Sequence, residues 1–182
     1  MLFISAGHHQ AAKGAEYKGF NEHDEAQTWV SLIANHLGSD CMVVPTGYLR
    51  DKVAFINTHT TDVQKDLAVE VHFNSAVKDG VHIGKGSECL FYPTSIRGYL
   101  LAEAVQETLG ELFPPNRGVK EGWYRMKKTN GPDFFLERTS CTALILEPEF
   151  IHRKAKIQQK RETACKQIAE ALMTFILNED FK

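Results

Sequence analysis

The stretch that decides the fold is DLAVEVHFNSA, residues 66–76. One face of this stretch is apolar and the other is mixed: Leu67, Val69, Val71 and Phe73 alternate with Ala68, Glu70, His72 and Asn74. Period-two alternation of this kind predicts a β-strand. Burying an imidazole or an amide costs free energy unless it has a partner. The polar end of the strand therefore needs partners from other segments.

The bulk composition is that of an ordinary globular chain. The 182 residues are 43% hydrophobic and 24% charged, so we expect one domain spanning residues 1–182 with a substantial core. The net charge of −2 and the pI of about 6.4 give no sign of a nucleic-acid partner. We expect the basic residues near the C-terminus to form a solvated helix face: Arg153, Lys154, Lys156, Lys160 and Arg161.

The four cysteines and the N-terminal residues bear on the compartment. No CxxC pair is present, which excludes a zinc ribbon or a thioredoxin-like motif, and we expect Cys41 and Cys141 to be small buried side chains. The opening MLFISAGHHQ has no basic region and too short an apolar stretch for a signal peptide, and no run approaches membrane-span length. We therefore expect synthesis in the cytoplasm, without a signal peptide or an integral membrane segment.

Apolar strands alternate with helical patterns along the chain. Strands are expected at 2–6, 41–44, within 66–76, at 88–92, 142–146 and, briefly, at 134–136. Helices are expected at 21–37, 51–61, 99–113 and, in a final stripe, 157–175. This alternation predicts an α/β fold, a three-layer αβα arrangement with a central, mostly parallel twisted sheet flanked by helices.

Three apolar strands end in polar residues. His8 follows the first strand, His72 ends the 66–76 strand and Glu147 follows the run Thr142 to Leu146. Ligands bind beyond the carboxyl ends of strands in open parallel sheets, so these side chains are expected to converge, with Glu22 on the segment leaving the first strand. Two histidines and one carboxylate form a usual catalytic zinc shell, and a second carboxylate can take a proton from water. The pattern favours a metal hydrolase, although no HExxH motif is present.

Several short motifs occur in an order typical of one family. They are Gly7-His8, Gly19-Phe20-Asn21-Glu22, Val71-His72-Phe73-Asn74, Gly86-Ser87-Glu88, Asn116-Arg117-Gly118-Val119-Lys120 and Leu144-Ile145-Leu146-Glu147. Over residues 2–152 the chain resembles the zinc-dependent N-acetylmuramoyl-L-alanine amidases of the Amidase_3 type, in particular the bacteriophage endolysin branch. The resemblance implies Zn²⁺ as cofactor, His8, Glu22 and His72 as its ligands, and Glu147 as the catalytic carboxylate. It also implies hydrolysis of the amide between the lactyl group of N-acetylmuramic acid and L-alanine of peptidoglycan.

Three of these assignments have rivals close by in the sequence. His9 stands where the family usually has a small residue, so it is the alternative to His8. Glu25 rivals Glu22, although Asn21-Glu22 matches the family better. Glu149 rivals Glu147, because Pro148 follows Glu147 where the family usually has glycine, but Glu147 directly ends the apolar run.

Other polar and aromatic residues have two open interpretations each. Asn74 either binds the stem peptide of the substrate or caps its strand, and Glu70 is either a partner of the His72 ring or a surface or helix-paired residue. Trp123 and Tyr124 either form a wall against the substrate or pack within the fold. No role is assigned to His23, His36, His59, His82 or His152.

The resemblance also implies a biological setting. The partner is peptidoglycan, and the chain is a single catalytic domain without a separate cell-wall-binding domain. A phage lysin of this kind acts at the cell wall after a holin-like protein opens the membrane, which leads to cell lysis. Two other hypotheses are a zinc amidase or peptidase that cuts another cell-wall peptide bond, and a non-catalytic cell-wall-binding domain.

Overall fold

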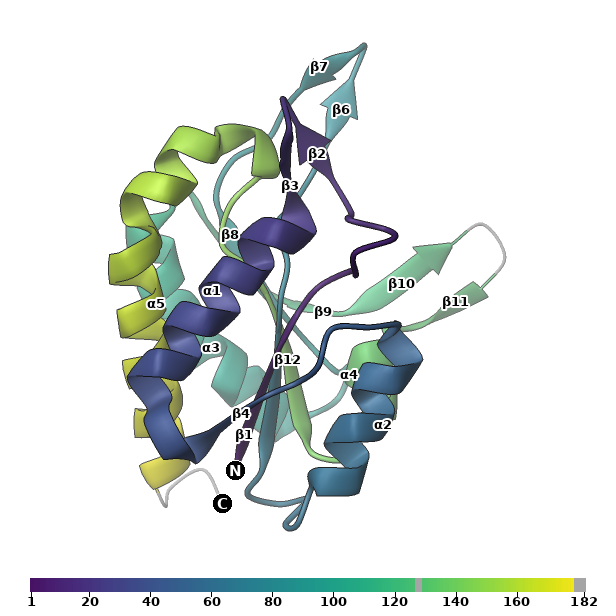
Figure 1. The fold of residues 1–182 in the computed structure, drawn as a ribbon, viewed down its shortest axis with the longest axis vertical. Helices are drawn as coiled ribbons and strands as arrows, with labels where there is room; N and C mark the ends of the chain where they lie inside the picture. Colours follow the sequence, from purple (N-terminus) through teal and green to yellow (C-terminus); the bar gives the residue numbers. More distant parts are fainter. Residues whose placement is uncertain (127–128, 179–182) are drawn as a thin grey trace.

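The computed structural model describes residues 1–126 and 129–178, and the side chains of all of these except 124–126 and 129–132. Its centre is a six-stranded sheet in the order β4-β1-β5-β12-β8-β9. Figure 1 shows α1, α3 and α5 against one face of this sheet and α2 and α4 against the other. The predicted three-layer αβα arrangement is therefore confirmed.

Four neighbouring strands of the sheet are parallel and two run the other way. The parallel strands are β4 (Cys41–Val43), β1 (Leu2–Ala6), β5 (Leu67–Val71) and β12 (Thr142–Glu147). The register pairs Val71 with both Ala6 and Leu146, so β1, β5 and β12 end at one level. The remaining strands are β8 (Ser87–Phe91), antiparallel to β12, and β9 (Asn116–Glu121), parallel to β8.

The long helices follow the predicted apolar stripes, with shifted ends. They are α1 (Glu22–Leu37), α2 (Leu49–His59), α3 (Ile96–Leu112) and α5 (Lys154–Leu177). The predicted cap of α1 is present, because the Asn21 side chain accepts a hydrogen bond from the Asp24 backbone N–H. Helix α3 begins three residues earlier than predicted, because Ser95 caps it by accepting from the Gly98 N–H.

Two local predictions were wrong. Phe134 to Leu136 is the start of the short helix α4 (Phe134–Arg138) and not a strand, because the Asp133 carboxylate accepts from the N–H groups of Phe135 and Leu136 and caps it. No strand is predicted between the helix at 99–113 and Phe134, but the structure has β9 there and the antiparallel pair of β10 (Trp123–Met126) and β11 (Thr129–Pro132).

Short elements surround the end of the sheet where β1, β5 and β12 finish. They are the pairs β2 (Glu16–Tyr17) with β3 (Phe20–Asn21) and β6 (Val77–Lys78) with β7 (Val81–His82). Figure 1 shows both pairs beyond the same end of the central sheet. Two single turns of 3-10 helix, Gly38–Asp40 and Ile151–Arg153, join longer elements.

Apolar packing on each face of the sheet holds the layers together. Trp29 of α1 is fully buried and packs edge-on against Phe73, with ring centroids 5.5 Å apart. A second cluster around Phe3, Ile56 and Phe135 fills the face covered by α2 and α4. Each such side chain contributes about 1.5–3 kcal/mol on burial, so these layers fix the strand ends firmly.

The predicted solvated face near the C-terminus is only partly present: Lys154 is exposed, but three of the five basic residues bind buried carboxylates. Arg153 and Lys156 contact the Glu149 carboxylate, at 3.0 and 3.5 Å, and Arg161 lies 3.1 Å from that of Glu25. Both carboxylates are buried, and a buried charge requires a partner, so these cations are recruited to them.

The cysteines are free thiols, of which Cys141 is buried as predicted and Cys41 only partly so. Cys41 lies on β4, an edge strand with one open side. In the described part of the chain, no helix combines the length and the apolar character needed to cross a membrane.

Candidate active site

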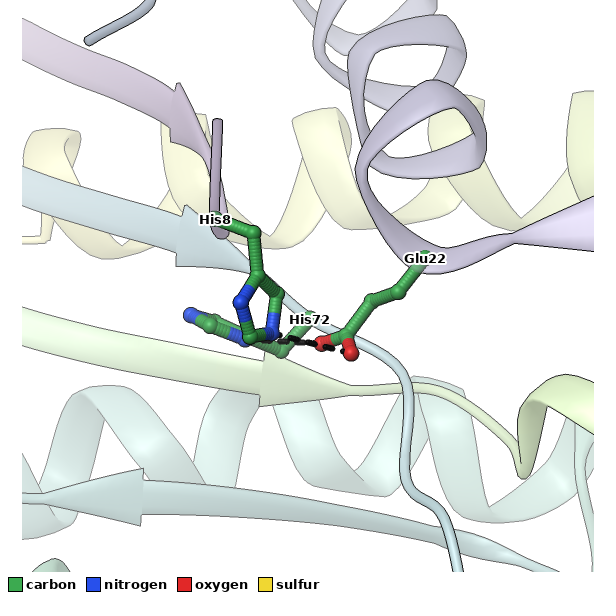
Figure 2. A group of neighbouring side chains, drawn as sticks. All are labelled: His8, Glu22 and His72. Atoms are coloured by element: carbon green, nitrogen blue, oxygen red, sulfur yellow. Dashed lines mark hydrogen bonds and ion pairs between the residues drawn. The ribbon is translucent and has the colours of Figure 1, made fainter. Parts of the chain in front are cut away.

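Three separate elements bring His8, Glu22 and His72 together. His8 lies one glycine beyond β1, Glu22 is the first residue of α1 and His72 directly follows β5. Figure 2 shows the three side chains pointing toward one another. One ligand atom from each residue lies within 4.8 Å of the others, which is close enough for one metal ion to bind all three.

The Glu22 carboxylate is the centre of this group. His8 Nε2 lies 2.9 Å from its Oε2, and His72 Nδ1 lies 2.8 Å from its Oε1. Backbone N–H groups of Ala15 and Phe73 donate to the same two oxygens, at 3.0 and 3.1 Å. Burial alone would raise the pKa of Glu22, but the hydrogen bonds from the two histidines hold it far below its usual range. Glu22 is therefore an anion at any pH relevant to the protein.

The backbone is fitted closely around the three side chains. His8 has a φ of +60°, a left-handed conformation that costs a non-glycine residue free energy. A Cβ on Gly14, which has a φ of +75°, would lie 2.5 Å from both His8 Nε2 and Glu22 Oε2. A Cβ on Gly7 would lie 2.5 Å from the His72 ring. Glycine at these positions leaves room for the two imidazoles.

The second nitrogen of the His72 ring faces another carboxylate. His72 Nε2 lies 3.1 Å from Glu70 Oε2, and Lys52 Nζ donates to Glu70 Oε1 at 2.6 Å. Glu70 is buried, so it is not a surface residue; it is a partner of the imidazole and is also paired with Lys52 of helix α2. Burial would lower the pKa of His72, but its hydrogen bonds to Glu22 and Glu70 raise it well above the usual range. A carboxylate behind a histidine is also the usual way to orient a metal-binding imidazole.

Glu147 ends β12 next to this group and has a free oxygen. Its Oε2 is buried and has no hydrogen-bond partner among the described residues. Burial raises the pKa of Glu147 to about 8, and the charges of Glu22 and Glu88 add to this, against the opposing charges of His72 and Arg117. A carboxyl group without partners and with a pKa near neutrality is suited to exchange a proton.

The three rival residues all have other partners. Glu149 is fully buried, accepts from the Gly86 N–H at 2.7 Å and is paired with Arg153 and Lys156. Glu25 accepts from the Trp29 indole N–H and is paired with Arg161. The His9 ring packs on Tyr48, with centroids 4.6 Å apart, and lies outside the His8–Glu22–His72 group.

The remaining predicted residues lie around this centre. Asn74 donates from its amide to Glu88 Oε1 at 2.8 Å, while its backbone pairs with Glu149 and Ile151, so it holds the strand end. Trp123 is about half exposed and donates to Glu121 at 2.8 Å, so it is free to form a wall on the solvent side. The side chain of Tyr124 lies outside the described residues.

Sequence reasoning missed three supporting residues. Lys52 was missed because a buried lysine next to Val53 in an amphipathic helix looks like an ordinary exposed one. The buried His23 ring lies 2.8 Å from the Gly7 carbonyl and supports the turn before His8. Arg117 occurs in a motif, but only its ion pair with Glu88 gives it a position.

A cavity of about 350 Å³ opens beside the two histidines. Its walls include His8, His72, His9, Tyr48, Leu49 and Asp133. An open cavity next to a histidine–carboxylate group gives a substrate access to it.

Comparisons with known proteins identify the family of the chain. The family model for N-acetylmuramoyl-L-alanine amidases, Amidase_3, matches residues 2–178. A search of curated protein sequences finds no match to the chain.

Solved structures with the same fold include an N-acetylmuramoyl-L-alanine amidase from Clostridium difficile 630, with a TM-score of 0.73, 23% identity and coverage of 97% of this chain and 94% of that one. The catalytic domain of the CD27L endolysin, which targets Clostridia difficile, has a TM-score of 0.71 and 22% identity, and the match covers 95% of this chain and 96% of that one. Cwp6 from Clostridium difficile has a TM-score of 0.78 and 20% identity over 95% of this chain, but only 28% of Cwp6 is covered.

At these identities the solved structures support the fold, whereas the family model, which spans nearly all of the chain, decides membership. The residues that the family model matches, 2–178, include the strand ends that carry His8, His72 and Glu147. The chain belongs to the N-acetylmuramoyl-L-alanine amidase family, Amidase_3.

Proposed function

We propose that this protein is a zinc-dependent N-acetylmuramoyl-L-alanine amidase. It hydrolyses the amide that joins the lactyl group of N-acetylmuramic acid to L-alanine in peptidoglycan. The observation that carries the proposal is the gathering of His8, Glu22 and His72 ligand atoms within 4.8 Å, beside Glu147, whose buried Oε2 has no partner among the described residues. The family match supports the choice of substrate.

The residues present fit a zinc ion. His8 would bind through Nε2 and His72 through Nδ1, since these nitrogens face Glu22, and the Glu70 carboxylate would keep the proton of His72 on Nε2. Two imidazoles and one carboxylate are a catalytic zinc set, and the space left by Gly7 and Gly14 accommodates the rings. Zinc bound there supplies a Lewis acid that polarises a carbonyl and lowers the pKa of a water molecule.

Glu147 carries the protons in this proposal. Its free Oε2 accepts a proton from the attacking water as the C–O bond forms at the lactyl carbonyl. The same group then donates that proton to the L-alanine nitrogen as the C–N bond breaks, because an amine leaves poorly unless it is protonated. The products are a free lactyl carboxylate and a stem peptide that begins with a free L-alanine amine.

Analysis of the products tests this reaction directly. Purified protein is incubated with peptidoglycan, before and after removal of metal with EDTA, and the products are identified by mass spectrometry. We expect stem peptides with a free L-alanine amine, lost with EDTA and restored by Zn²⁺. Cleavage within the stem peptide would indicate a zinc peptidase instead, and binding to the wall without cleavage would indicate a non-catalytic wall-binding protein.

We further propose that residues 1–182 act as a single catalytic domain of a phage-type endolysin that reaches the cell wall after a holin-like protein opens the membrane. The ordered motifs of this branch and the endolysin among the structures of the same fold support this role. Expression in a bacterium with and without a co-expressed holin tests it. We expect lysis only with the holin, and lysis without it would contradict the dependence on a separate membrane-opening protein.

A further inference from the structure

A second charged group lies directly beside Glu147. Glu88 of β8 is the Cα partner of Glu147 in the antiparallel pair of β8 and β12, and it is only 6% exposed. The guanidinium of Arg117 on β9 contacts Glu88 Oε2 through Nε and Nη2, both at 3.0 Å. The ammonium of Lys120, also on β9, contacts the same oxygen, and Asn74 occupies Oε1. One carboxylate thus holds two cations next to the candidate catalytic residue.

The two cations exceed what the buried carboxylate needs. One cation would neutralise Glu88, and within the described residues Glu88 is the only carboxylate paired with either Arg117 or Lys120. Both cationic side chains reach solvent, with 29% of the Arg117 side chain and 43% of the Lys120 side chain exposed. Glu88, Arg117 and Lys120 together carry one more positive than negative charge, and both cations are partly exposed to a molecule bound at the site.

The guanidinium of Arg117 is held in a fixed orientation. Its carbon Cζ lies 4.9 Å from the centroid of the Phe150 ring, and two of its nitrogens are bound to Glu88. The third nitrogen, Nη1, has no partner in the part of the chain that the structure describes. The free guanidinium nitrogen and the neighbouring ammonium can each donate a charge-assisted hydrogen bond to a carboxylate.

We propose that Arg117 and Lys120 form a subsite for a carboxylate of the stem peptide, on the L-alanine side of the scissile amide. This inference rests on the proposed amidase function and names the form of substrate preferred. The residue that follows L-alanine carries a free α-carboxylate in unamidated peptidoglycan and a neutral amide in amidated peptidoglycan. The protein therefore prefers the acidic stem peptide.

Binding of the two product dipeptides tests the subsite without depending on turnover. Isothermal titration calorimetry compares the γ-methylamides of L-alanyl-D-glutamate and L-alanyl-D-isoglutamine, in which the γ-carboxyl group is blocked as it is in the stem peptide, so that the two differ only in the α-carboxylate. We expect the acid to bind about tenfold more tightly, a difference typical of one partly exposed charge-assisted contact. In Arg117→Gln and Lys120→Gln the two dipeptides should bind within about twofold of each other.

Two controls separate the subsite from general effects. Lys120→Gln leaves Arg117 to neutralise Glu88, so it tests the subsite even if Arg117→Gln lowers the melting temperature. Lys166→Gln on α5 removes one charge from a side chain that is 63% exposed and paired with Glu170, and it should keep the full preference.

Equal affinity of the wild type for the two dipeptides, or no measurable binding of either, would overturn the subsite. A preference that persists in both Arg117→Gln and Lys120→Gln would overturn it as well. Failure of the amidase function would look different, because the acidic dipeptide would still bind preferentially while peptidoglycan stayed uncut.

Discussion

The two ends of the central sheet differ in how their charged groups are satisfied. At the amino-terminal end, Asp66 precedes β5, and its carboxylate accepts from the N–H groups of Thr61 and Asp62, at 2.8 and 3.1 Å. Arg97 joins the same end to β12 by donating to the Thr142 hydroxyl at 2.8 Å. At the carboxyl end, His8 has a left-handed backbone and Glu147 has an unpartnered buried oxygen.

This difference separates stability from function within one sheet. Hydrogen-bonded charges such as Asp66 hold elements together, and their polar atoms are not available to bind a ligand. Backbone strain and an unpartnered polar atom are costly for stability, and such features concentrate at functional sites. Five predictions test this contrast, from the largest expected effect to the smallest.

Replacing Glu147 should have the largest effect. Glu147→Gln keeps the shape of the side chain but removes its basic oxygen, so we expect kcat for muropeptide hydrolysis to fall about 10³-fold or more, with bound zinc unchanged. The matched control is Glu149→Gln, two residues further along. It should lower the melting temperature by breaking the pairs with Arg153 and Lys156 but keep kcat in the folded protein. Near-normal turnover by Glu147→Gln would contradict the role assigned to Glu147.

Removing one histidine of the group should remove the metal. His72→Ala deletes the nitrogen that faces Glu22, so we expect zinc affinity to fall at least about 100-fold, measured by competition with a chelator and by elemental analysis. His59→Ala, an exposed histidine on α2, is the control and should bind zinc normally. Unchanged zinc content in His72→Ala would refute its role as a ligand.

Adding one methyl group at Gly14 should disturb the His8–Glu22–His72 group from the backbone side. In Gly14→Ala the new Cβ must displace His8 or Glu22, and we expect zinc affinity to fall about tenfold. Gly19→Ala is a matched control, because Gly19 has nearly the same φ, +74°, but a Cβ there would meet nothing within 4 Å. It should lose roughly 1 kcal/mol of stability from backbone strain with normal zinc binding. Equal zinc affinity in the two variants would show that the close fit at Gly14 is unimportant.

At the opposite end of the sheet a substitution should affect stability alone. Asp66→Asn weakens the contacts to the Thr61 and Asp62 N–H groups, so we expect the free energy of unfolding to fall by about 1–3 kcal/mol. Denaturant unfolding measures this loss, and kcat/KM below the melting temperature should be unchanged. A fall in kcat/KM with normal stability would mean that the two ends of the sheet are coupled.

The smallest effect on activity accompanies the last prediction, which concerns only how the stability of the metal-free protein depends on pH. The folded pKa of Glu147, about 8, lies above its ordinary value of 4.5, so between these values the folded state binds more protons than the unfolded state. Stability should therefore decline as pH rises from about 5 to about 8, and Glu147→Gln should lack this part of the decline. Thermal melts of both proteins in EDTA measure it. Parallel melting curves at every pH would show that Glu147 titrates normally.

Much of the fold could be predicted from periodicity. The strands at 2–6, 67–71 and 142–147 are mostly apolar because both faces of the sheet are covered by helices, and such stretches are visible in one sequence. The error at Phe134 to Leu136 has a local cause, because three apolar residues fit either element and the Asp133 cap selects the helix. The error at Arg161 is not local, because its buried partner Glu25 lies on α1, whereas Arg153 pairs with Glu149 only four residues earlier in the chain.

The sequence by itself determined the α/β class and the polar ends of the strands, and parallel strands place His8 and His72 at the same edge of the sheet. Only the tertiary structure decided which neighbour in each pair is held by other partners. Glu25 and Glu149 are held by arginines and His9 packs on Tyr48, whereas Glu22 lies between His8 and His72 and Glu147 keeps a buried oxygen without a partner among the described residues. The reason is physical: the state of an ionisable group depends on partners within a few ångströms, and those partners come from segments that only folding brings together.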